Sequence, residues 1–539
     1  MKRDLGYKFM LAFEGYEVPE QIRTWIQERN PAGFTIFRPL NVQSPAQVRA
    51  LTAELQTIVK QANQPPLIIG TDQEGGQLNA LGEETTLFPG NMALGATRDA
   101  DLARQVGQAM GRELAALGIN VNYAPNCDIN TNPNNPACGA RAFSDDPSLA
   151  TQMAVAFVEG MQAEGVAATI KHFPGKGEAK VDSHYALPLI DHSRERLEQM
   201  ELRPFRAAIS AGAKLVMTGH FAIPSLTGSA ELPATLSRAV MRDFVRDELG
   251  FEGIVITDAL DMGAISQGAG QIVDVITAVR AEVDLLLLTK SAEVQERLYA
   301  GLQLAYSRKL IDETHLKPSL ARIMALKQWV SGTPQPPLDV VACAAHQKLA
   351  QTVTNRSVTL LRDDAGLLPL QLDADARIAV IMPQPKELTP ADTSSFITLT
   401  LATAVRKYHP HVDEFITSHP PTEAEISTLR EKATGYDYLI VGSISASMDK
   451  MQADLVNELL VTAVPTITVA LRTPYDLTVY PQSQTHICTY SILPTAMRAL
   501  AAALWGEIPF QGKLPVQVGD LYGFGHGLSL TSRPVVSRS

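Results

Sequence analysis

Short apolar runs alternate with longer amphipathic stretches over residues 1–330 of this 539-residue chain. Continuous apolar runs are typical of strands that are buried on both faces of a parallel sheet. The pattern predicts eight such strands, at residues 7–13, 33–37, 67–71, 119–124, 166–171, 215–219, 253–257 and 283–288. Apolar residues recur at steps of three and four in the helices predicted between the strands, of which the clearest span 45–62, 99–117, 148–164 and 194–211.

Eight strands with eight crossovers in about 300 residues predict a (β/α)₈ barrel. The main alternative is a doubly wound open sheet, which would carry a glycine-rich phosphate loop after its first strand. Glu14-Gly15-Tyr16 follows the first predicted strand and does not supply that loop. The expected fold class is therefore α/β, a TIM-like barrel followed by a smaller α/β sandwich domain.

A proline-rich break at residues 331–339 marks the boundary between the two expected domains. We expect a catalytic barrel over 1–332, a linker over 333–340 and an α/β sandwich domain over 341–539. The pattern after the break predicts a helix at 341–354 and then an alternation of strands at 377–382, 438–441, 466–471 and 486–490 with helices at 393–408, 422–434 and 495–505.

The charge of the chain limits its partners. The formal net charge is −11, which disfavours nucleic acid and anionic membrane surfaces as partners. No apolar run reaches eighteen residues, so no membrane span is expected. The first residues resemble a buried strand more than a secretion signal, and a cytoplasmic location is expected. The cysteines are expected to be free thiols, although a bridge between Cys127 and Cys138 is an alternative.

Polar and ionisable residues follow successive predicted strands. In a barrel of this kind the carboxyl ends of the strands carry the chemistry. A charge at such a place must be paired or must face a cleft, so clustering at several strand ends indicates a functional site. The residues concerned are Asp72 after strand three, Asn122, Tyr123 and Asp128 after strand four, Lys171 and His172 after strand five, His220 after strand six and Asp258 after strand seven.

Asp258 follows the apolar run Ile254-Val255-Ile256-Thr257, which would hold its carboxylate rigidly at the barrel mouth. A carboxylate fixed in this way is suited to attack an anomeric carbon or to stabilise an oxocarbenium-like state. The structural alternative is that Asp258 caps the following helix.

Asp182 and His184 lie two residues apart in the loop after the fifth strand. In a turn the carboxylate can accept a hydrogen bond from the imidazole and set its tautomer. Because the loop 175–185 contains glycines and is long enough to fold over the barrel mouth, we expect a general acid/base on a mobile segment. The nucleophile, in contrast, is expected to be fixed.

A metal site is an alternative use of the same residues, because His172, His184, His220, Asp182 and Asp258 can in principle converge as ligands. No His-x-His pair follows the first strand, and Lys171 beside His172 would repel a cation. We therefore expect neither a metal nor a cofactor.

Three stretches of the barrel together resemble glycoside hydrolase family 3, within it the bacterial β-N-acetylglucosaminidases. They are residues 72–76, residues 171–177 with the triplet Asp182-Ser183-His184, and residues 256–262. Stretches beyond the linker, at 357–362, 366–370 and 512–516, are similar to the C-terminal domain of the same family. The resemblance thus covers nearly the whole chain.

This resemblance implies a retaining hydrolase that removes terminal β-linked N-acetylglucosamine, from an oligosaccharide or a cell-wall muropeptide. Asp258 would be the nucleophile, and His184, held by Asp182, would be the acid/base. By similarity, sugar ligands would be Asp72, Arg141, Lys171 and His172, with His220 and Met262 in the pocket wall.

The chain departs from the family pattern at Gln77 and Ala80, where arginines are usual, and at Lys176, where histidine is usual. We expect these departures to alter contacts with the non-reducing end of the sugar but not the chemistry. The second domain shows no obvious carboxylate motif facing the barrel, and is expected to be a scaffold or a wall of the cleft.

Two other functions remain open at this point. A histidine acid/base leaves the site less negative than a glutamate would, which can admit phosphate and make the chain a β-N-acetylglucosaminide phosphorylase. A catalytically inactive sugar-binding protein is the other alternative, although the presence of Asp258, Asp182 and His184 argues against it.

Overall fold

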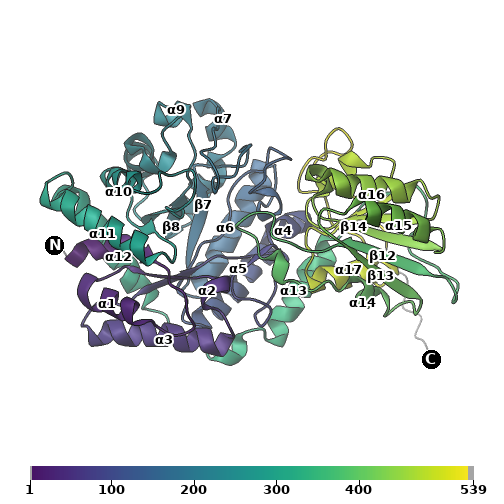
Figure 1. Ribbon diagram of the computed structural model, residues 1–539, viewed down its shortest axis with the longest axis horizontal. Coiled ribbons are helices and arrows are strands. Elements are labelled where there is room, and N and C mark those ends of the chain that lie inside the picture. The colour runs from purple at the N-terminus through teal and green to yellow at the C-terminus, as the bar shows by residue number, and fades with distance from the viewer. Residues whose placement is uncertain (1–2, 532–539) are drawn as a thin grey trace.

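The structure, a computed structural model, describes residues 3–531 and consists of two α/β domains that lie side by side (Figure 1). In the first domain, eight parallel strands occur in the order β10-β1-β2-β3-β6-β7-β8-β9. A parallel bridge between Ile256 and Leu285 joins the two ends of this row and closes the barrel. The strands are β1 (Phe9–Leu11), β2 (Gly33–Ile36), β3 (Ile68–Thr71), β6 (Val121–Asn122), β7 (Ala167–Phe173), β8 (Leu215–Thr218), β9 (Ile254–Thr257) and β10 (Leu286–Leu287). The predicted barrel is confirmed.

Helices surround the barrel because their apolar faces bury the outward-facing side chains of the strands. They include α1 (Glu20–Arg29), α2 (Arg38–Asn41), α3 (Pro45–Gln61), α4 (Asn91–Thr97), α5 (Ala100–Ala116), α6 (Pro147–Ala163), α10 (Gly270–Arg280), α11 (Ala292–Ser307) and α12 (Glu313–Val330). The inward-facing side chains form a separate core, and Ile323 and Leu326 of α12 close it from below. A hairpin of β4 (Gln73–Gly75) and β5 (Leu78–Asn79) follows β3 and reaches toward the second domain.

Two barrel elements differ from the sequence prediction. Residues 7–8 are not part of the first strand, because a 3₁₀ helix over Arg3–Lys8 precedes it and carries Lys8 under the barrel. The helix predicted at 194–211 is divided into α7 (Arg194–Gln199) and α8 (Leu202–Ser210). Pro204 has no N–H to donate to the carbonyl of Met200, and the chain leaves helical geometry at that residue.

The second domain is built on a six-stranded sheet in the order β11-β16-β15-β14-β12-β13, in which only β11 is antiparallel. Helices α14 and α17 pack on one face of this sheet, and α15 and α16 pack on the other. The elements are β11 (Thr359–Asp363), β12 (Ile378–Pro383), α14 (Leu401–Val405), β13 (Val412–Thr417), α15 (Glu423–Ala433), β14 (Tyr438–Ser443), α16 (Lys450–Leu460), β15 (Thr466–Ala470), β16 (Thr485–Cys488) and α17 (Pro494–Leu504). The predicted smaller α/β sandwich is therefore present.

The helix predicted at 393–408 is wrong over half of its length, since only α14 and a 3₁₀ turn at Ser394–Phe396 are helical there. Local polar side chains satisfy the backbone instead. The Asp392 carboxylate accepts from the N–H groups of Leu388 and Ser394, and the N–H of Thr393 donates to the carbonyl of Gln77 in the barrel. The part of this segment that precedes α14 is therefore an interdomain loop.

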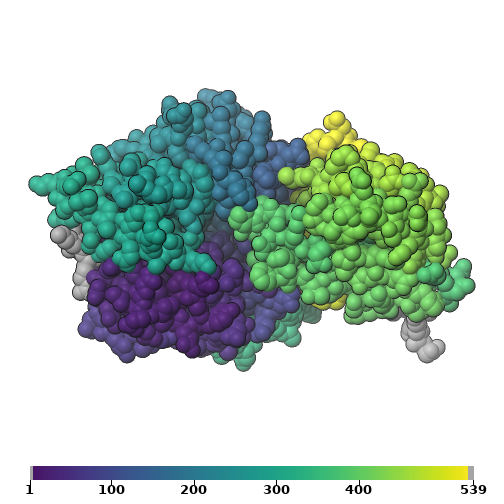
Figure 2. Space-filling model, viewed as in Figure 1, coloured from purple at the N-terminus to yellow at the C-terminus, as the bar shows by residue number. Residues whose placement is uncertain are grey.

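The two domains are joined by a connection and by α13 (Ala344–Ser357). The connection includes the predicted linker 333–340 and lies along the barrel, where the carbonyl of Pro336 accepts from Arg49. Helix α13 packs against α4 and α5 of the barrel and against α17 of the second domain. Figure 2 shows the second domain in contact with the barrel beside a hollow between the two.

Candidate active site

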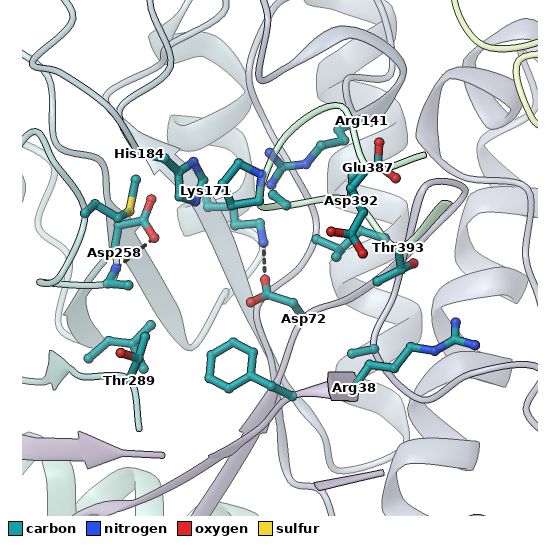
Figure 3. Close-up of a pocket in the computed structure, with 18 of the residues that line it drawn as sticks. Arg38, Asp72, Arg141, Lys171, His184, Asp258, Thr289, Glu387, Asp392 and Thr393 are labelled. Atoms are coloured by element: carbon teal, nitrogen blue, oxygen red, sulfur yellow. Dashed lines mark hydrogen bonds and ion pairs between the residues drawn. The ribbon is translucent and has the colours of Figure 1, made fainter. Parts of the chain in front are cut away.

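A cavity of about 470 Å³ opens at the carboxyl ends of the barrel strands (Figure 3). Side chains that end or follow β2, β3, β7, β8, β9 and β10 line it, and the second-domain segment 387–396 closes one side. Seven of the nine residues predicted to act at the site line this cavity: Asp72, Arg141, Lys171, His172, His184, Asp258 and Met262. Residues that are far apart in the chain thus share one pocket.

Asp258 directly follows β9, and its backbone is fixed by a hydrogen bond of 3.0 Å from its N–H to the carbonyl of Thr218 in β8. One carboxylate oxygen accepts from the N–H of Ala259 at 2.9 Å. Burial alone would raise the pKa of this carboxyl, but attraction to His172 and the other nearby imidazoles in their charged form, and to Lys176, outweighs burial and holds the pKa well below its usual range. The carboxylate is therefore rigid and ionised.

His184 and Asp182 form a pair at the edge of the cavity. The Nδ1 atom of His184 lies 2.7 Å from the Asp182 carboxylate, which also accepts from the His184 N–H at 3.0 Å. Burial works against the charge on Asp182, yet the hydrogen bond from His184 lowers the pKa of Asp182 to about 2. A permanent carboxylate thus fixes the imidazole tautomer and leaves Nε2 for a ligand.

The loop that carries His184 is held more firmly than its glycine content predicts. The carbonyls of Ser183 and His184 accept from the N–H groups of Ala264 and Gly263, at 3.1 and 2.9 Å. A Cβ at position 263 would lie 2.9 Å from the His184 carbonyl oxygen, so this approach requires glycine. The loop after β9 therefore supports both Asp258 and His184 in this structure.

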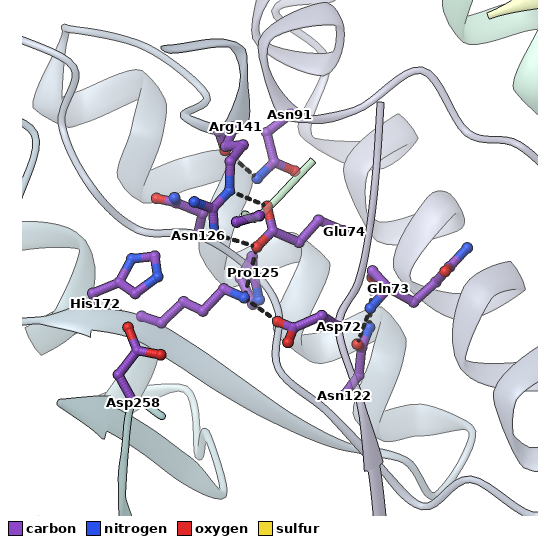
Figure 4. A network of polar contacts seen from close by, with 12 residues as sticks. Asp72, Gln73, Glu74, Asn91, Asn122, Pro125, Asn126, Arg141, His172 and Asp258 are labelled. Atoms are coloured by element: carbon purple, nitrogen blue, oxygen red, sulfur yellow. Dashed lines mark hydrogen bonds and ion pairs between the residues drawn. The ribbon is translucent and has the colours of Figure 1, made fainter. Parts of the chain in front are cut away.

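A buried network of alternating charges forms the floor of the cavity (Figure 4). The Lys171 ammonium lies 2.5 Å from Asp72 and 2.6 Å from Glu74, and Glu74 makes a bidentate pair with Arg141 at 2.8 and 3.0 Å. Burial raises the pKa of Asp72, whereas Arg141 and Lys171 hold the pKa of Glu74 well below its usual range. The charged groups of the floor therefore hold one another in fixed orientations.

His172 and Lys176 are both organised by Asp128, which is fully buried. The Asp128 carboxylate lies 2.8 Å from Nδ1 of His172 and accepts from the N–H of Lys176 at 2.8 Å. Burial lowers the pKa of His172 well below its ordinary value, so this imidazole is neutral at physiological pH. Its Nδ1–H donates to Asp128, and its Nε2 is an acceptor for a ligand hydroxyl.

The other two predicted site residues lie behind the cavity wall. His220 is fully buried, with Nδ1 at 2.9 Å from the Thr235 hydroxyl and Nε2 at 3.1 Å from the Ala259 carbonyl. The prediction that His220 lines the pocket is therefore wrong, because these bonds turn its ring into the protein. Asp182 likewise lies behind the His184 ring and reaches the cavity only through it.

The second domain contributes more than a neutral wall. Glu387 and Asp392 line the cavity opposite Asp258, with Lys171 and Asp72 between them (Figure 3). The second domain is thus a wall of the cleft, and this wall includes two carboxylates that no obvious sequence motif indicated. Asp392 is buried and lies 3.8 Å from Arg472, whereas Glu387 is exposed and accepts from the Ser395 hydroxyl at 2.7 Å.

Arg38 is a further cavity residue that the sequence analysis missed. It follows β2 and places its guanidinium 4.3 Å from the ring centre of Phe396 in the second domain. A charged residue at a strand end is the available signal, but Phe37-Arg38-Pro39 also fits the start of a helix. Lys176 also lines the cavity. The sequence analysis expected it to affect sugar contacts only, whereas in the structure it also helps to lower the pKa of Asp258.

The histidines of the pocket do not converge on one point. Each has its own polar partner, Asp128 for His172, Asp182 for His184 and Thr235 for His220. Over residues 3–531, no group of three or more His, Cys, Asp or Glu side chains is arranged to hold a metal ion.

The four cysteines are unpaired, including Cys127 and Cys138. None of the helices described for the chain is long and apolar enough to cross a membrane.

The arrangement combines a fixed ionised carboxylate, an imidazole with a set tautomer and a floor of hydrogen-bonding groups. A carboxylate of this kind can attack an electrophilic carbon or stabilise a cation, and an imidazole can donate and then remove a proton. The neutral Nε2 of His172 and the Asp72–Lys171 pair can bind neighbouring hydroxyl groups. The pocket is therefore suited to breaking a bond at a carbon of a polyhydroxylated ligand.

Comparisons with known proteins agree with this chemistry. The profile of the "Glycosyl hydrolase family 3 N terminal domain" matches residues 8–326. The chain is 31% identical to β-hexosaminidase A of Pseudoalteromonas piscicida, covering 95% of this chain and 96% of that protein. It superposes with a TM-score of 0.91 on a family 3 β-N-acetylglucosaminidase from Paenibacillus, at 37% identity over 96% and 99% of the chains. A β-glucoside phosphorylase superposes with a TM-score of 0.81 at 25% identity, over 96% and 94%.

Proposed function

The chain belongs to glycoside hydrolase family 3, and from this membership and the pocket geometry we propose that it removes terminal β-linked N-acetylglucosamine with retention of configuration. The chain is a glycoside hydrolase. The observation that carries the proposed mechanism is that Asp258, ionised and rigid, lines the same cavity as His184, whose ring is held by Asp182. Nucleophile and acid/base are the two groups that such a reaction requires.

In the first step, a carboxylate oxygen of Asp258 forms a bond to the anomeric carbon while the bond to the leaving oxygen breaks. His184 gives its Nε2 proton to that oxygen. Asp182 stabilises the protonated imidazole before the step, because its pKa of about 2 keeps it negative at physiological pH. The products of the step are a glycosyl ester on Asp258 and the free aglycone.

In the second step, the neutral His184 removes a proton from a water molecule, which attacks the anomeric carbon from the side that the aglycone left. The bond to Asp258 breaks and the carboxylate is restored. Two inversions retain the β configuration, and His184 regains the proton that it needs for the next cycle. Most glycosidases use two carboxylates for these steps, and here an imidazole–carboxylate pair takes the place of one of them.

The floor of the cavity is proposed to bind the sugar ring. Asp72 and Lys171 would bind neighbouring hydroxyls, and His172 would accept from a third through Nε2. Arg141 has its guanidinium held by Glu74 and by the Ala137 carbonyl, so it can present its edge to the ligand without moving. Met262 supplies an apolar contact in the wall.

The proposed substrate follows from the names of the relatives, a β-hexosaminidase and a β-N-acetylglucosaminidase. We further propose that the natural substrates include N-acetylglucosamine-containing oligosaccharides or cell-wall muropeptides, and that the enzyme acts in the cytoplasm. The four unpaired cysteines support a reducing compartment.

Phosphorolysis is a second candidate, which the superposition on a β-glucoside phosphorylase and the position of Lys176 favour. Lys176 lines the cavity and lies close enough to Asp258 to lower its pKa. A cation beside the anomeric carbon would reduce the repulsion between phosphate and the carboxylate. In that reaction phosphate would replace water in the second step.

The test is turnover of an aryl β-N-acetylglucosaminide, followed by nuclear magnetic resonance of the sugar that forms. Retaining hydrolysis predicts β-N-acetylglucosamine as the first product, and an acid-quenched enzyme in which the peptide containing Asp258 is heavier by one sugar residue. An α product would contradict the double displacement. A wild-type protein that binds the sugar without turnover would instead support the inactive sugar-binding alternative.

Addition of phosphate separates the two reactions. Hydrolysis predicts an unchanged rate and free sugar, whereas phosphorolysis predicts a faster second step and a sugar 1-phosphate. Chelator treatment is a further control, since a reaction carried by Asp258 and His184 is expected to survive it.

A further inference from the structure

A second cavity, of about 360 Å³, lies in the second domain and shares no lining residue with the catalytic pocket. It is formed by the loops that follow β12, β13, β14 and β15, and residues 133–139 of the barrel close it from one side. Nothing in the proposed glycosidase reaction uses these residues.

The position of the cavity in the sheet is the one at which α/β domains bind ligands. Strand β12 pairs with β13 on one side and with β14 on the other. The chain therefore adds β13 on one side of β12 and its next strands, β14 to β16, on the other side. The helices that follow these strands lie on opposite faces, and a crevice results at the carboxyl ends of the strands. Lys386, His419 and Ser445 follow β12, β13 and β14 at this point.

The charge of the cavity is positive. Arg472 is nine-tenths buried, and the nearest oxygen of its carboxylate partner Asp392 is 3.8 Å away, outside hydrogen-bond distance. The Lys386 ammonium donates to the His419 carbonyl at 2.9 Å. Burial lowers the pKa of His419, so this imidazole adds no charge at neutral pH.

The remaining ionisable groups of the lining are occupied with each other or with the backbone. The Asp449 carboxylate accepts from the N–H groups of Met451 and Gln452 at the start of α16 and lies 3.8 Å from His419. Lys450 is exposed and pairs with Asp454 one helical turn away. Arg472 and Lys386 are therefore the two cations that can bind an anion in this cavity.

Apolar side chains also line the cavity, among them Leu388, Pro420, Ile444 and Met448. A buried arginine and a lysine beside an apolar wall fit a ligand that has one anionic group and a compact apolar body. We propose that this cavity is a second binding site for a small organic anion, a phosphate or a carboxylate, which Arg472 and Lys386 hold by charge-assisted hydrogen bonds.

The same arginine connects the second cavity to the catalytic pocket. Its Nε donates to the side-chain oxygen of Gln77 at 2.8 Å, and the Gln77 carbonyl accepts from the N–H and the hydroxyl of Thr393 at 2.7 and 3.0 Å. Thr393 and Asp392 line the catalytic pocket. An anion that draws Arg472 away from Gln77 and Asp392 would therefore alter the wall opposite Asp258, and sugar binding would in turn alter affinity for the anion.

Calorimetric titration of the full-length protein with phenyl phosphate, and separately with benzoate, tests this site and distinguishes the two anionic groups. We expect saturable binding of at least one of them. Lys386→Ala is expected to weaken it about tenfold or more, because one charge-assisted bond is lost. Met448→Trp, which fills the cavity without a change of charge, is expected to weaken it as well.

Two controls make the result decisive. Lys407→Ala removes an exposed lysine between α14 and β13, before the amino end of β13 and hence at the end of the strands opposite the cavity, and is expected to leave the affinity unchanged. Lys176→Ala removes a cation of the catalytic pocket, so binding that is lost in this variant but retained in Lys386→Ala would overturn the proposal. Absence of saturable binding of both probes to the wild-type protein would also overturn it. None of these outcomes depends on turnover, so they are distinct from a failure of the proposed reaction.

Discussion

Each end of the barrel holds an aspartate beside β9, a fully buried Asp284 at one end and a half-buried Asp258 at the other, and the two have different surroundings. Asp284 lies at the closed end, where one oxygen accepts from Arg246 at 2.5 Å and from the N–H of Val255 at 2.8 Å, and the other accepts from Arg322 at 2.8 Å. Asp258 lies at the open end, accepts from the N–H of Ala259 and faces the cavity.

The lysines differ in the same way. At the closed end the Lys8 ammonium donates to the Val283 carbonyl and the Ser319 hydroxyl, both at 2.6 Å, and Lys327 donates to the carbonyls of Ala32 and Pro66. At the open end Lys176 lines the cavity.

A buried charge thus has one of two roles in this barrel. At the closed end its partners belong to the protein, and the charge contributes to the fold. At the open end, neighbouring charges keep the side chain ionised, and the side chain lines the cavity. A charged group in this position indicates a ligand-binding site. Substitutions at the two ends should therefore separate activity from stability.

The largest effect is expected for Asp258→Asn, which should lower kcat by at least about 10⁴-fold because the proposed nucleophile is removed. Thermal unfolding of the same variant should be close to that of wild type. Steady-state kinetics with an aryl β-N-acetylglucosaminide, together with calorimetry, would measure both. A variant that retains a tenth of the activity would show that Asp258 is not the nucleophile.

His184→Ala is expected to lower turnover on the order of 10²–10⁴-fold for a substrate with a poor leaving group. The loss in the first step should be much smaller for an aryl substrate whose leaving oxygen needs no proton. Pre-steady-state rates for the two substrate types would show this difference. Equal losses would argue against the acid role and leave the histidine as a structural group.

Asp284→Asn should have the opposite profile to Asp258→Asn. Removal of the carboxylate leaves Arg246 and Arg322 buried without their partner, at a cost of about 3–5 kcal/mol in the free energy of unfolding. The kcat of the folded fraction should remain that of wild type. Urea unfolding and active-site-normalised kinetics would test this, and a loss of kcat without a loss of stability would contradict the distinction between the two ends.

The barrel and most of the residues at its mouth could be predicted from the sequence, because both depend on local patterns of apolar and polar residues. Apolar runs identify strands, and a polar residue after such a run lies at the carboxyl end whatever the rest of the chain does. Asp258, Lys171 and Asp72 were found in this way. His220 follows the same rule and was nevertheless misplaced, because the orientation of its ring depends on Thr235, which is remote from the strand.

The second-domain wall could not be predicted, because it depends on how the two domains dock. Gln77 and Arg472 are separated by 395 positions, and no periodicity relates them. Domain docking also explains why the helix predicted at 393–408 does not begin at Thr393, since Thr393 donates to the Gln77 carbonyl in the barrel. The edge strand β13 was missed for a different reason: most of it is exposed or half-buried, and Asp413 and Glu414 interrupt its apolar residues.

At the closed end, Lys8 makes stability depend on pH. Burial lowers the pKa of Lys8 to about 7 from its ordinary value of 10.5. Between these values the unfolded chain binds more protons than the folded one, so the contribution of Lys8 to the free energy of unfolding rises with pH, by up to about 1.4 kcal/mol per unit. Below pH 7 the cost of the buried charge is fully present.

Lys8→Met removes this titration. The difference in unfolding free energy between wild type and Lys8→Met should therefore shift in favour of wild type from about pH 7 to about pH 9. Lys180→Met, at an exposed lysine, is the control and should show no such trend. Parallel pH profiles for wild type and Lys8→Met would contradict the assignment, and kcat of the folded enzyme should be unaffected.

At the open end, Lys176 should affect the pH dependence of activity rather than of folding. Burial raises the pKa of Asp258, and Lys176 is among the groups that bring it below its usual range. Lys176→Met should therefore raise the pKa of the Asp258 carboxyl, and the acid limb of kcat/KM should move to higher pH. The loss, about tenfold, should be confined to the acid end of the profile, and Lys176→Arg should restore the limb because it restores the charge. A uniform loss at all pH values, without rescue by arginine, would mean that Lys176 acts by packing and not through the field at Asp258.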